Sequence, residues 1–334
     1  MRRLHLILDG LPRPGDATAA MQRYAPSLSS LLARGRVLPG QPSLSVAIAR
    51  AFGLDQTLPI APYTLAMDGL SPEDAAWLRA DPVCLHFYQD QLVLLGPDRL
   101  DVRADEADAL IVALQGHFGV EGLAFHAPRA DRWYVRLDGN EAIPHTAPLD
   151  AVVGRPVECH LPRGPEAARW RRRLNEIQML LHDHPVNRAR EAAGQWPINS
   201  VWFWGGGRHL PLPPPACSGL AARHPLARAL AKAAGLACVD PDRPETLGDT
   251  EAAMVILELP GGDDAERLVE ALRQLEESWF RPALRRLRRG AIRTMHLDCT
   301  GASSASRALT PLSVYRFWQR PSCLLYTSPS PRDS

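Results

Sequence analysis

The chain has 334 residues, of which 46% are apolar and 22% are charged, and its formal net charge is +1. A chain of this length can form one large or two medium-sized domains. Its near-neutral charge excludes long-range attraction to nucleic acid or to an anionic membrane surface. No apolar run approaches the roughly 18 residues of a membrane span, so we expect neither a nucleic-acid nor a membrane partner.

The start of the chain predicts a strand and not a secretion signal. After the basic residues 2–3, the apolar stretch is short and is interrupted by Asp9, whereas a signal peptide needs a longer apolar core. The six cysteines are scattered without a Cys-x-x-Cys pair. This pattern is typical of reduced thiols and argues against a zinc site or a disulfide framework. We therefore expect a cytoplasmic protein.

A strand and a helix come first in the chain. Residues 4–8 are apolar and predict a strand that ends at Asp9 and Gly10. Residues 26–35 predict a helix, because a proline stands in the first turn and a glycine at the end. A strand, a loop with an acidic residue and a helix are a typical α/β opening. Asp9 stands where open α/β sheets bind ligands.

The middle of the chain, residues 58–163, predicts an inserted α+β domain. Short apolar runs predict strands, and one amphipathic run predicts a helix. The expected strands are residues 83–86, 91–95, 123–126 and 133–137, and the expected helix is residues 104–117. A turn at residues 89–90 joins the first two strands.

Residues 164–321 return to an α/β pattern. The expected helices are residues 165–181, 224–234 and 265–287, and the expected strands are residues 200–204, 253–259 and 294–297. Asp298 follows the last strand directly. We expect residues 1–57 and 164–321 to form one discontinuous core. Residues 322–334 back-translate to a string that resembles a sequencing adapter, so we expect a non-native tail there.

The most polar stretch, residues 182–190, precedes a glycine run at residues 205–207. Backbone N–H groups at a helix end and a glycine-rich turn can approach a phosphate, and Asn and Arg side chains can bind its oxygens. The alternative is a capped helix end beside a tight turn and buried tryptophans. His182 and His184 are two residues apart, unlike the i, i+4 pair of a metal-binding helix, which favours helix capping or substrate contact.

Acidic and hydroxyl side chains near the predicted strand ends are candidates for catalysis. Asp9 and Asp298 could share a divalent cation, although such sites use more than two ligands. Ser43 and Ser45 could act as nucleophiles if a metal activates them. Serines near a helix start are also common N-caps, and both interpretations remain open at this point.

One long motif runs from His184 to Gly207 and reads H-P-V-N-x-x-R-x-x-x-G-x-x-P-x-N-x-x-W-x-W-G-x-G. It resembles the signature of archaeal-type 2,3-bisphosphoglycerate-independent phosphoglycerate mutases, of the alkaline phosphatase superfamily. Weaker matches in the same order cover residues 4–300. A bacterial branch, known as phosphoglycerate mutase or Rpf-type regulatory protein, is similar as far as residues 315–318. The resemblance implies an alkaline-phosphatase-like sheet core flanked by helices, with a smaller inserted α+β domain.

The resembled family implies two-metal phosphoryl transfer. A metal-activated serine takes the phosphoryl group from one hydroxyl of glycerate and returns it to the other, with two divalent cations (Mn, Mg or Zn). In this chain the metal-binding histidines have no counterpart. Cys299 follows Asp298 where the family has Asp-His, and no histidine follows His296. The family's acidic, histidine-containing block is also shorter here and lacks its histidine.

The nucleophile position departs from the family as well, because the family's serine falls on Leu44, between Ser43 and Ser45. Loss of imidazole ligands lowers metal affinity, and an unactivated serine is a weak nucleophile. We therefore expect no cofactor, and we interpret Asp9 and Asp298 as vestigial metal ligands.

The resulting hypothesis is a regulatory protein with a depleted metal site, which binds a phosphorylated metabolite or a protein partner. The residues that would line its retained pocket are Arg79, Asp81, Arg132, His184, Asn187, Arg190, Asn199 and Gly205. The alternative is an active mutase or phosphatase that uses two divalent cations and Ser43 or Ser45. A third possibility is an interaction module whose pocket has no function.

Overall fold

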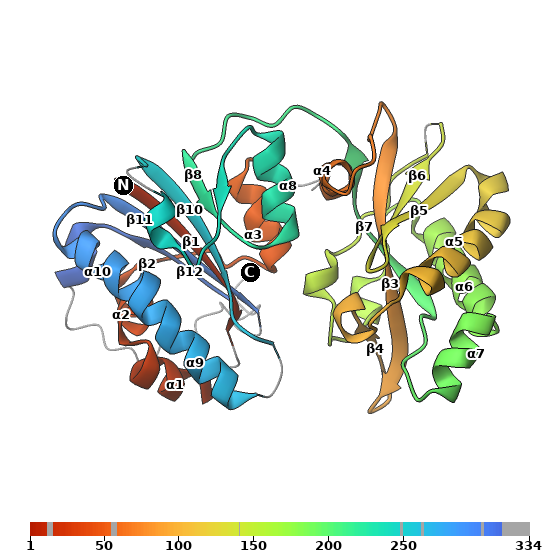
Figure 1. The fold of residues 1–334 in the computed structure, drawn as a ribbon, viewed down its shortest axis with the longest axis horizontal. Helices are drawn as coiled ribbons and strands as arrows, with labels where there is room; N and C mark the ends of the chain where they lie inside the picture. The colour runs from red at the N-terminus through yellow and green to blue at the C-terminus, as the bar shows by residue number, and fades with distance from the viewer. Residues whose placement is uncertain are drawn as a thin grey trace. The chain divides into compact units, whose positions relative to one another are not determined.

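The computed structural model describes residues 1–11, 16–54, 59–139, 141–247, 250–261, 264–301 and 304–315. The expected tail at residues 322–334 lies outside these ranges. The chain divides into two compact units, which Figure 1 shows as ribbons. Unit 1 contains Met1–Gly53 and Pro213–Ser334, and unit 2 contains Leu54–Leu212.

Unit 1 is built on a seven-stranded sheet with the strand order β2-β12-β11-β1-β10-β8-β9. Its strands are β1 (Arg3–Leu11), β2 (Arg36–Leu38), β8 (Gly219–Ala221), β9 (Cys238–Val239), β10 (Ala252–Glu258), β11 (Thr294–Gly301) and β12 (Ala305–Leu309). The pairings of β1 with β10 and β11 are parallel, and β12 runs antiparallel to β11 and β2. A parallel sheet is covered on both faces. Accordingly, Leu6, Ile7 and Leu8 of β1 are all fully buried.

Helices flank this sheet on both faces (Figure 1). They are α1 (Asp16–Tyr24), α2 (Pro26–Arg34), α3 (Leu44–Ala51), α8 (Pro225–Ala233), α9 (Ala265–Leu275) and α10 (Arg281–Arg288), with a π-helical turn at Glu276–Phe280 and 3-10 turns at Pro244–Leu247 and Pro311–Tyr315. One core cluster joins Leu6 to Leu31 of α2 and to Phe280. The predicted α/β core, a sheet flanked by helices, is confirmed.

Strand β11 extends past the end that the sequence predicts. Its expected tip was Asp298, but the strand continues to Gly301, and Asp298 pairs with Ser306 of β12. The antiparallel strand β12, which the sequence analysis does not predict, pairs with β11 as far as Cys299, and Leu11 of β1 pairs with Gly301. Asp298 therefore lies within the sheet and not at the edge where open α/β sheets bind ligands.

Unit 2 is a five-stranded sheet in which all the pairings are antiparallel. Its strands are β3 (Ala76–Tyr88), β4 (Gln91–Leu95), β5 (Leu123–Arg129), β6 (Arg132–Leu137) and β7 (Ser200–Arg208), and its helices are α4 (Ile60–Met67), α5 (Ala104–Phe118), α6 (Ala167–His182) and α7 (Pro185–Ala192). Short 3-10 turns lie at Pro97–Arg99, Gly119–Glu121, Leu149–Ala151 and Glu158–His160. Gln89 and Asp90, between β3 and β4, have φ angles of 47° and 63°. These values suit a two-residue hairpin, as the sequence predicts.

The second predicted domain boundary, at residue 163, differs from the structure. Residues 164–212 belong to unit 2, because β7 pairs with β3 over much of its length. Trp170 and Ile177 of α6 also pack in one cluster with Phe203 of β7. The strand and helix pattern of this region is compatible with either unit, and only the pairing partner of β7 distinguishes them. The first boundary, at residues 57–58, lies outside the described residues.

The glycine run at residues 205–207 is part of β7 and does not form the turn that the sequence predicts. A Cβ atom on Gly206 would lie 2.3 Å from Leu78 Cδ2, and one on Gly207 would lie 2.4 Å from Pro59 Cβ. Gly205 has a φ angle of +62°, which L side chains rarely adopt. These glycines therefore allow close packing against neighbouring elements and a local irregularity in the strand.

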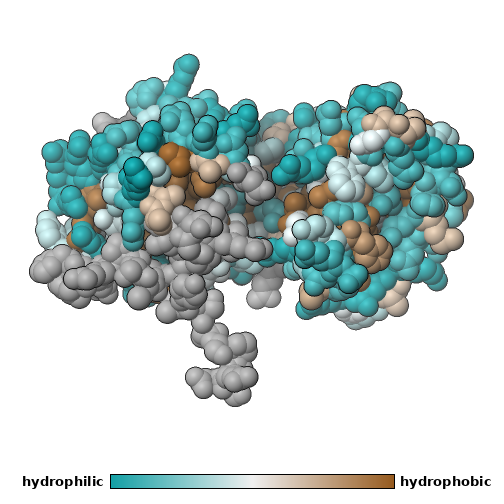
Figure 2. Space-filling model, turned by 90° about the horizontal axis from the view of Figure 1, so that it is seen from below, coloured by the Kyte–Doolittle hydropathy of each residue, from teal (hydrophilic) through white to brown (hydrophobic). Residues whose placement is uncertain are grey.

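The described residues on the face shown in Figure 2 are mainly polar. In the view of Figure 2, hydrophilic residues cover most of the coloured atoms, and the hydrophobic areas between them are smaller. In the described ranges, no helix combines the length and the apolar character needed to cross a membrane.

Candidate functional site

The two asparagines of the long motif bind backbone groups. Asn187 is fully buried, and its amide donates to the carbonyls of Leu181 and Ile198 at 2.8 and 2.9 Å and accepts from the Ile198 N–H at 2.7 Å. Asn199 makes a matching pair of bonds with the backbone of Leu85, at 2.8 and 2.9 Å. Both side chains hold segments of unit 2 together, so their polar atoms already have partners within the protein.

Arg190 of α7 is also committed to internal partners. Its guanidinium donates to Glu106 Oε2 at 2.7 Å, to the Trp196 carbonyl at 2.8 Å and to the Leu100 carbonyl. The Arg190 side chain is 2% exposed, and that of Glu106 is 3% exposed. The interpretation of Arg190 as a phosphate ligand therefore has no support in this geometry, because the three backbone and side-chain acceptors occupy its guanidinium.

His184 forms the N-cap of α7. Its Nδ1 accepts a hydrogen bond from the Val186 N–H at 3.3 Å, which only a neutral imidazole can do. Burial and the nearby charge of Arg188 both lower the pKa of His184. This contact corresponds to the capping alternative in the sequence analysis.

We expect the cap of α7 to be lost in acid. Because the folded pKa lies below the unfolded value of about 6.5, the stabilisation is complete above about pH 6.5 and decreases as pH falls through the folded pKa. The His184→Asn variant keeps a capping acceptor that does not titrate, so between pH 7 and 5 it should gain about 1 kcal/mol relative to the wild type. Urea unfolding across this pH range measures the difference. Parallel pH profiles for the two proteins would contradict it.

Arg79, Asp81 and Trp204 form a buried cluster at the pairing of β3 with β7. The Arg79 guanidinium donates to Asp81 Oδ1 at 2.5 and 3.1 Å, and Trp204 Nε1 donates to Asp81 Oδ2 at 2.6 Å. The guanidinium also lies 5.1 Å from the Trp204 ring centroid, a cation–π distance. Burial raises the pKa of Asp81, and the charge of Arg79 opposes this shift. The cluster fixes the orientation of the Trp204 ring.

Arg132 belongs to a second cluster that is joined to the first. Its guanidinium donates two hydrogen bonds to Asp68, both at 2.6 Å, and the Tyr134 hydroxyl donates to Asp68 Oδ2 at 2.6 Å. The Tyr134 ring lies 5.3 Å from the Arg79 guanidinium. The structure thus brings Arg79 and Arg132 into one network. Sequence reasoning missed Asp68 and Tyr134, since neither stands in a recognisable motif.

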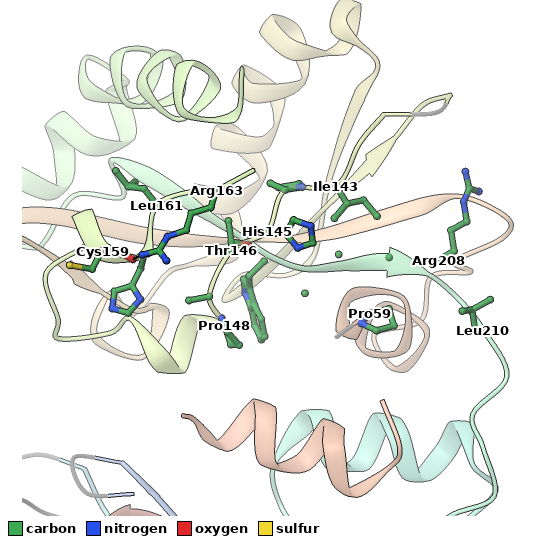
Figure 3. A pocket seen from close by; sticks show the side chains of 17 residues that line it. Pro59, Ile143, His145, Thr146, Pro148, Cys159, Leu161, Arg163, Arg208 and Leu210 are labelled. Atoms are coloured by element: carbon green, nitrogen blue, oxygen red, sulfur yellow. Dashed lines mark hydrogen bonds between the residues drawn. The ribbon is translucent and has the colours of Figure 1, made fainter. Parts of the chain in front are cut away.

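A cavity of about 870 Å³ lies in unit 2 next to Trp204. Its lining comes from residues 143–148, from part of residues 159–163, from residues 204–208 of β7, and from Pro59 and Leu210 (Figure 3). Its titratable groups are basic or thiol: Arg163, Arg208, His145, His160 and Cys159. Among the described lining residues there is no aspartate or glutamate. Of the predicted site residues, only Gly205 lines this cavity directly.

The predicted metal ligands of unit 1 are separate from each other. Asp9 Oδ1 accepts a hydrogen bond from the Thr300 hydroxyl at 2.5 Å, whereas Asp298 Oδ2 lies 2.7 Å from His5 Nε2. The register of β1 with β11 places Asp298 beside Ile7, so the two carboxylates lie at different levels along the strands. Burial raises the pKa of Asp298, but the hydrogen bond with His5 holds it below its ordinary value.

No group of three or more His, Cys, Asp or Glu side chains within the described ranges is arranged to hold a metal ion. Cys299 is fully buried, and burial strongly raises the pKa of its thiol. A neutral thiol is a poor ligand, and alternation along β11 directs Cys299 to the face opposite Asp298.

The two candidate nucleophiles lie at the start of α3. Ser43 is its N-cap, with Oγ accepting a hydrogen bond from the Val46 N–H at 3.4 Å. Ser45 lies in the first turn and is 3% exposed. Ser43 therefore has the capping role that is common for serines at helix starts, and a catalytic role for either serine stays a prediction.

Comparison with known proteins identifies relatives of one kind at low identity. No protein-family model matches the chain. It is 27% identical over 212 residues to a probable 2,3-bisphosphoglycerate-independent phosphoglycerate mutase of Geobacter sulfurreducens, covering 58% of this chain and 51% of that protein. It is 27% identical over 228 residues to the 2,3-bisphosphoglycerate-independent phosphoglycerate mutase of Methanosarcina mazei, covering 62% and 55%. The chain spans about half the length of these curated relatives.

Two solved structures are similar to most of the chain. The cofactor-independent phosphoglycerate mutase from Thermoplasma acidophilum matches with a TM-score of 0.46 and 17% identity, over 92% of this chain and 89% of that one. The PH0037 protein from Pyrococcus horikoshii matches with a TM-score of 0.49 and 16% identity, over 92% and 85%. The predicted similarity to phosphoglycerate mutases is confirmed at the level of sequence relatives.

Proposed function

We propose that this chain is a phosphoglycerate-mutase-like protein that binds a phosphorylated small molecule in a regulatory role, without two-metal catalysis. The unit 2 cavity is the observation that carries this proposal. Its described lining contains two arginines and two histidines and no carboxylate, a composition that favours an anionic ligand. The relatives named phosphoglycerate mutase support the choice of a phosphate ester.

The proposed absence of two-metal catalysis rests on the donors of unit 1. Asp9 and Asp298 interact with different partners, Thr300 and His5. A dinuclear phosphotransferase holds its two cations about 3.5–4 Å apart with several ligands each, whereas each of these carboxylates is hydrogen-bonded to a protein side chain. We derive no catalytic step through metal ions for this arrangement.

Calorimetry with 3-phosphoglycerate, together with metal analysis and an assay for its conversion to 2-phosphoglycerate, tests the proposal. We expect binding that survives treatment with a chelator, no stoichiometric metal, and no turnover when Mn, Mg or Zn is added. About two bound cations per chain with turnover would overturn it in favour of the active mutase. In that case a Ser43→Ala, Ser45→Ala double variant should lose turnover, because one of them would be the nucleophile.

A further inference from the structure

The unit 2 cavity is large for a three-carbon phosphate. Small-molecule sites commonly occupy about 300–1,000 Å³, and the cavity of about 870 Å³ lies near the top of this range. A phosphoglycerate would leave much of this space to solvent. The volume therefore favours a larger ligand.

One end of the lining carries two basic side chains. Arg163 and His160 lie close together there, and Arg163 Nη2 donates to the Cys159 carbonyl at 2.6 Å. The backbone of Arg163 is tied to His145 by a bridge with an N–H···O bond of 3.2 Å. The charges of Arg155 and Arg163 contribute, after burial, to the lowered pKa of His160. Figure 3 shows Arg163 and Arg208 at opposite ends of the cavity. Arg208 donates to the Asp74 carbonyl, and the end with both Arg163 and His160 has two basic side chains for one anionic group.

Part of the remaining wall is apolar. Ile143, Pro148 and the Trp204 ring line it, and Trp204 is held by its bond to Asp81 and by the contact with Arg79. Next to Trp204 in β7, the glycines at residues 205–207 also line the cavity and contribute only backbone to its wall. Rigid rings and a bare strand are complementary to a planar, apolar group, because such surfaces gain contact area with little loss of side-chain entropy.

We propose that the cavity binds a phosphate monoester of nucleotide size, with its phosphate at Arg163 and His160 and its planar ring system against Trp204 and Pro148. This inference rests on the proposed function, and it names the class of ligand. It differs from the substrate of the related mutases, which has no ring. Recognition comes from the basic side chains at one end and from the rings of Trp204 and Pro148 in the lining.

Cys159 offers a direct readout, because it is exposed and lines the cavity, whereas Cys84, Cys217 and Cys299 are buried. The rate of maleimide modification at Cys159 is followed by peptide mass spectrometry. Adenosine monophosphate at saturating concentration should slow it at least tenfold. Adenosine, inorganic phosphate and 3-phosphoglycerate at the same concentration should slow it less. Adenosine lacks the charged phosphate, and the other two compounds are smaller and lack the ring system.

Variants test the two halves of the site by calorimetry. Arg163→Ala should weaken adenosine monophosphate binding about tenfold, the loss expected for a charged hydrogen bond, and Arg163→Lys should restore part of it. Ala147→Trp fills the cavity and should abolish binding. The matched control is Arg129→Ala, which removes an exposed arginine paired with Asp131 and should leave affinity unchanged. Urea unfolding verifies that each variant folds; if Ala147→Trp does not, the Arg163 pair decides the outcome.

The results separate this inference from the proposed function. Binding of adenosine monophosphate that depends on Arg163 supports both. Binding of 3-phosphoglycerate without binding of adenosine monophosphate overturns the nucleotide-sized ligand and leaves the proposed function standing. If neither binds, both are overturned. Binding of adenosine monophosphate that Arg163→Ala and Arg129→Ala weaken equally would place the ligand outside this cavity and overturn the inference.

Discussion

Replacing Arg190 by alanine is expected to lower the free energy of unfolding by about 3–5 kcal/mol. This is the usual cost of removing one member of a buried ion pair, because the remaining charge stays buried without its partner. Here the remaining charge is Glu106, whose side chain is 3% exposed and would keep only its longer contact with the exposed Arg103, at 3.4 Å, and the hydrogen bond from the Arg103 N–H. The carbonyls of Leu100 and Trp196 lose a donor in the same substitution. Chemical denaturation, followed by the tryptophan fluorescence of unit 2, measures the change.

Arg188→Ala is the matched control for this prediction. Arg188 lies on the same helix and is exposed, so its loss should cost no more than about 1 kcal/mol. Should Arg190→Ala fail to fold, Arg190→Lys keeps the positive charge but cannot make all three bonds, and an intermediate loss is expected. A change below about 1 kcal/mol together with loss of phosphate-ester binding would instead support the ligand role that the sequence motif suggests.

Replacing Asp68 by alanine is expected to destabilise unit 2 by a similar amount, about 3–5 kcal/mol. The substitution removes three hydrogen bonds of 2.6 Å and leaves Arg132 and the Tyr134 hydroxyl without these acceptors. The side chain of Arg132 is only 10% exposed, so water can restore little of the lost solvation. Thermal and urea unfolding of the full chain measure the effect.

Asp131→Ala provides the comparison for Asp68. Asp131 pairs with Arg129 at 3.1 Å, but both side chains are more than half exposed, at 53% and 52%. Exposed pairs of this kind contribute about 0–1 kcal/mol. Equal stability losses for Asp68→Ala and Asp131→Ala would show that the Asp68 cluster is not buried in solution as it is in the structure.

Much of the fold can be read from local sequence patterns. The strand at residues 91–95, the turn before it and the helix that begins at residue 104 all appear where the sequence predicts them. The helix after Pro26 also begins at its proline. These elements depend on interactions between residues close in the chain: apolar periodicity, the φ angle of proline and the preferences of a two-residue turn.

The sequence does not reveal that several of the predicted site residues bind backbone groups of the protein, and the reason is physical. Asn187, Arg190 and Asn199 have the side chains expected for a phosphate site, but the same side chains can satisfy buried backbone groups. Two of the partners, Leu85 and Leu100, stand far away in the sequence. Nothing near the motif indicates that these carbonyls and N–H groups need partners.

The sequence by itself determined the α/β class of the core, the presence of an inserted α+β unit and the similarity to phosphoglycerate mutases. Only the tertiary structure decided that β7 joins unit 2, that Asp298 lies inside β11, and that the cavity is lined by Arg163 and His160. Strand pairing and cavity shape depend on contacts between distant residues. Local patterns set which elements form, whereas the pairing of distant backbone groups sets which side chains remain available to a ligand.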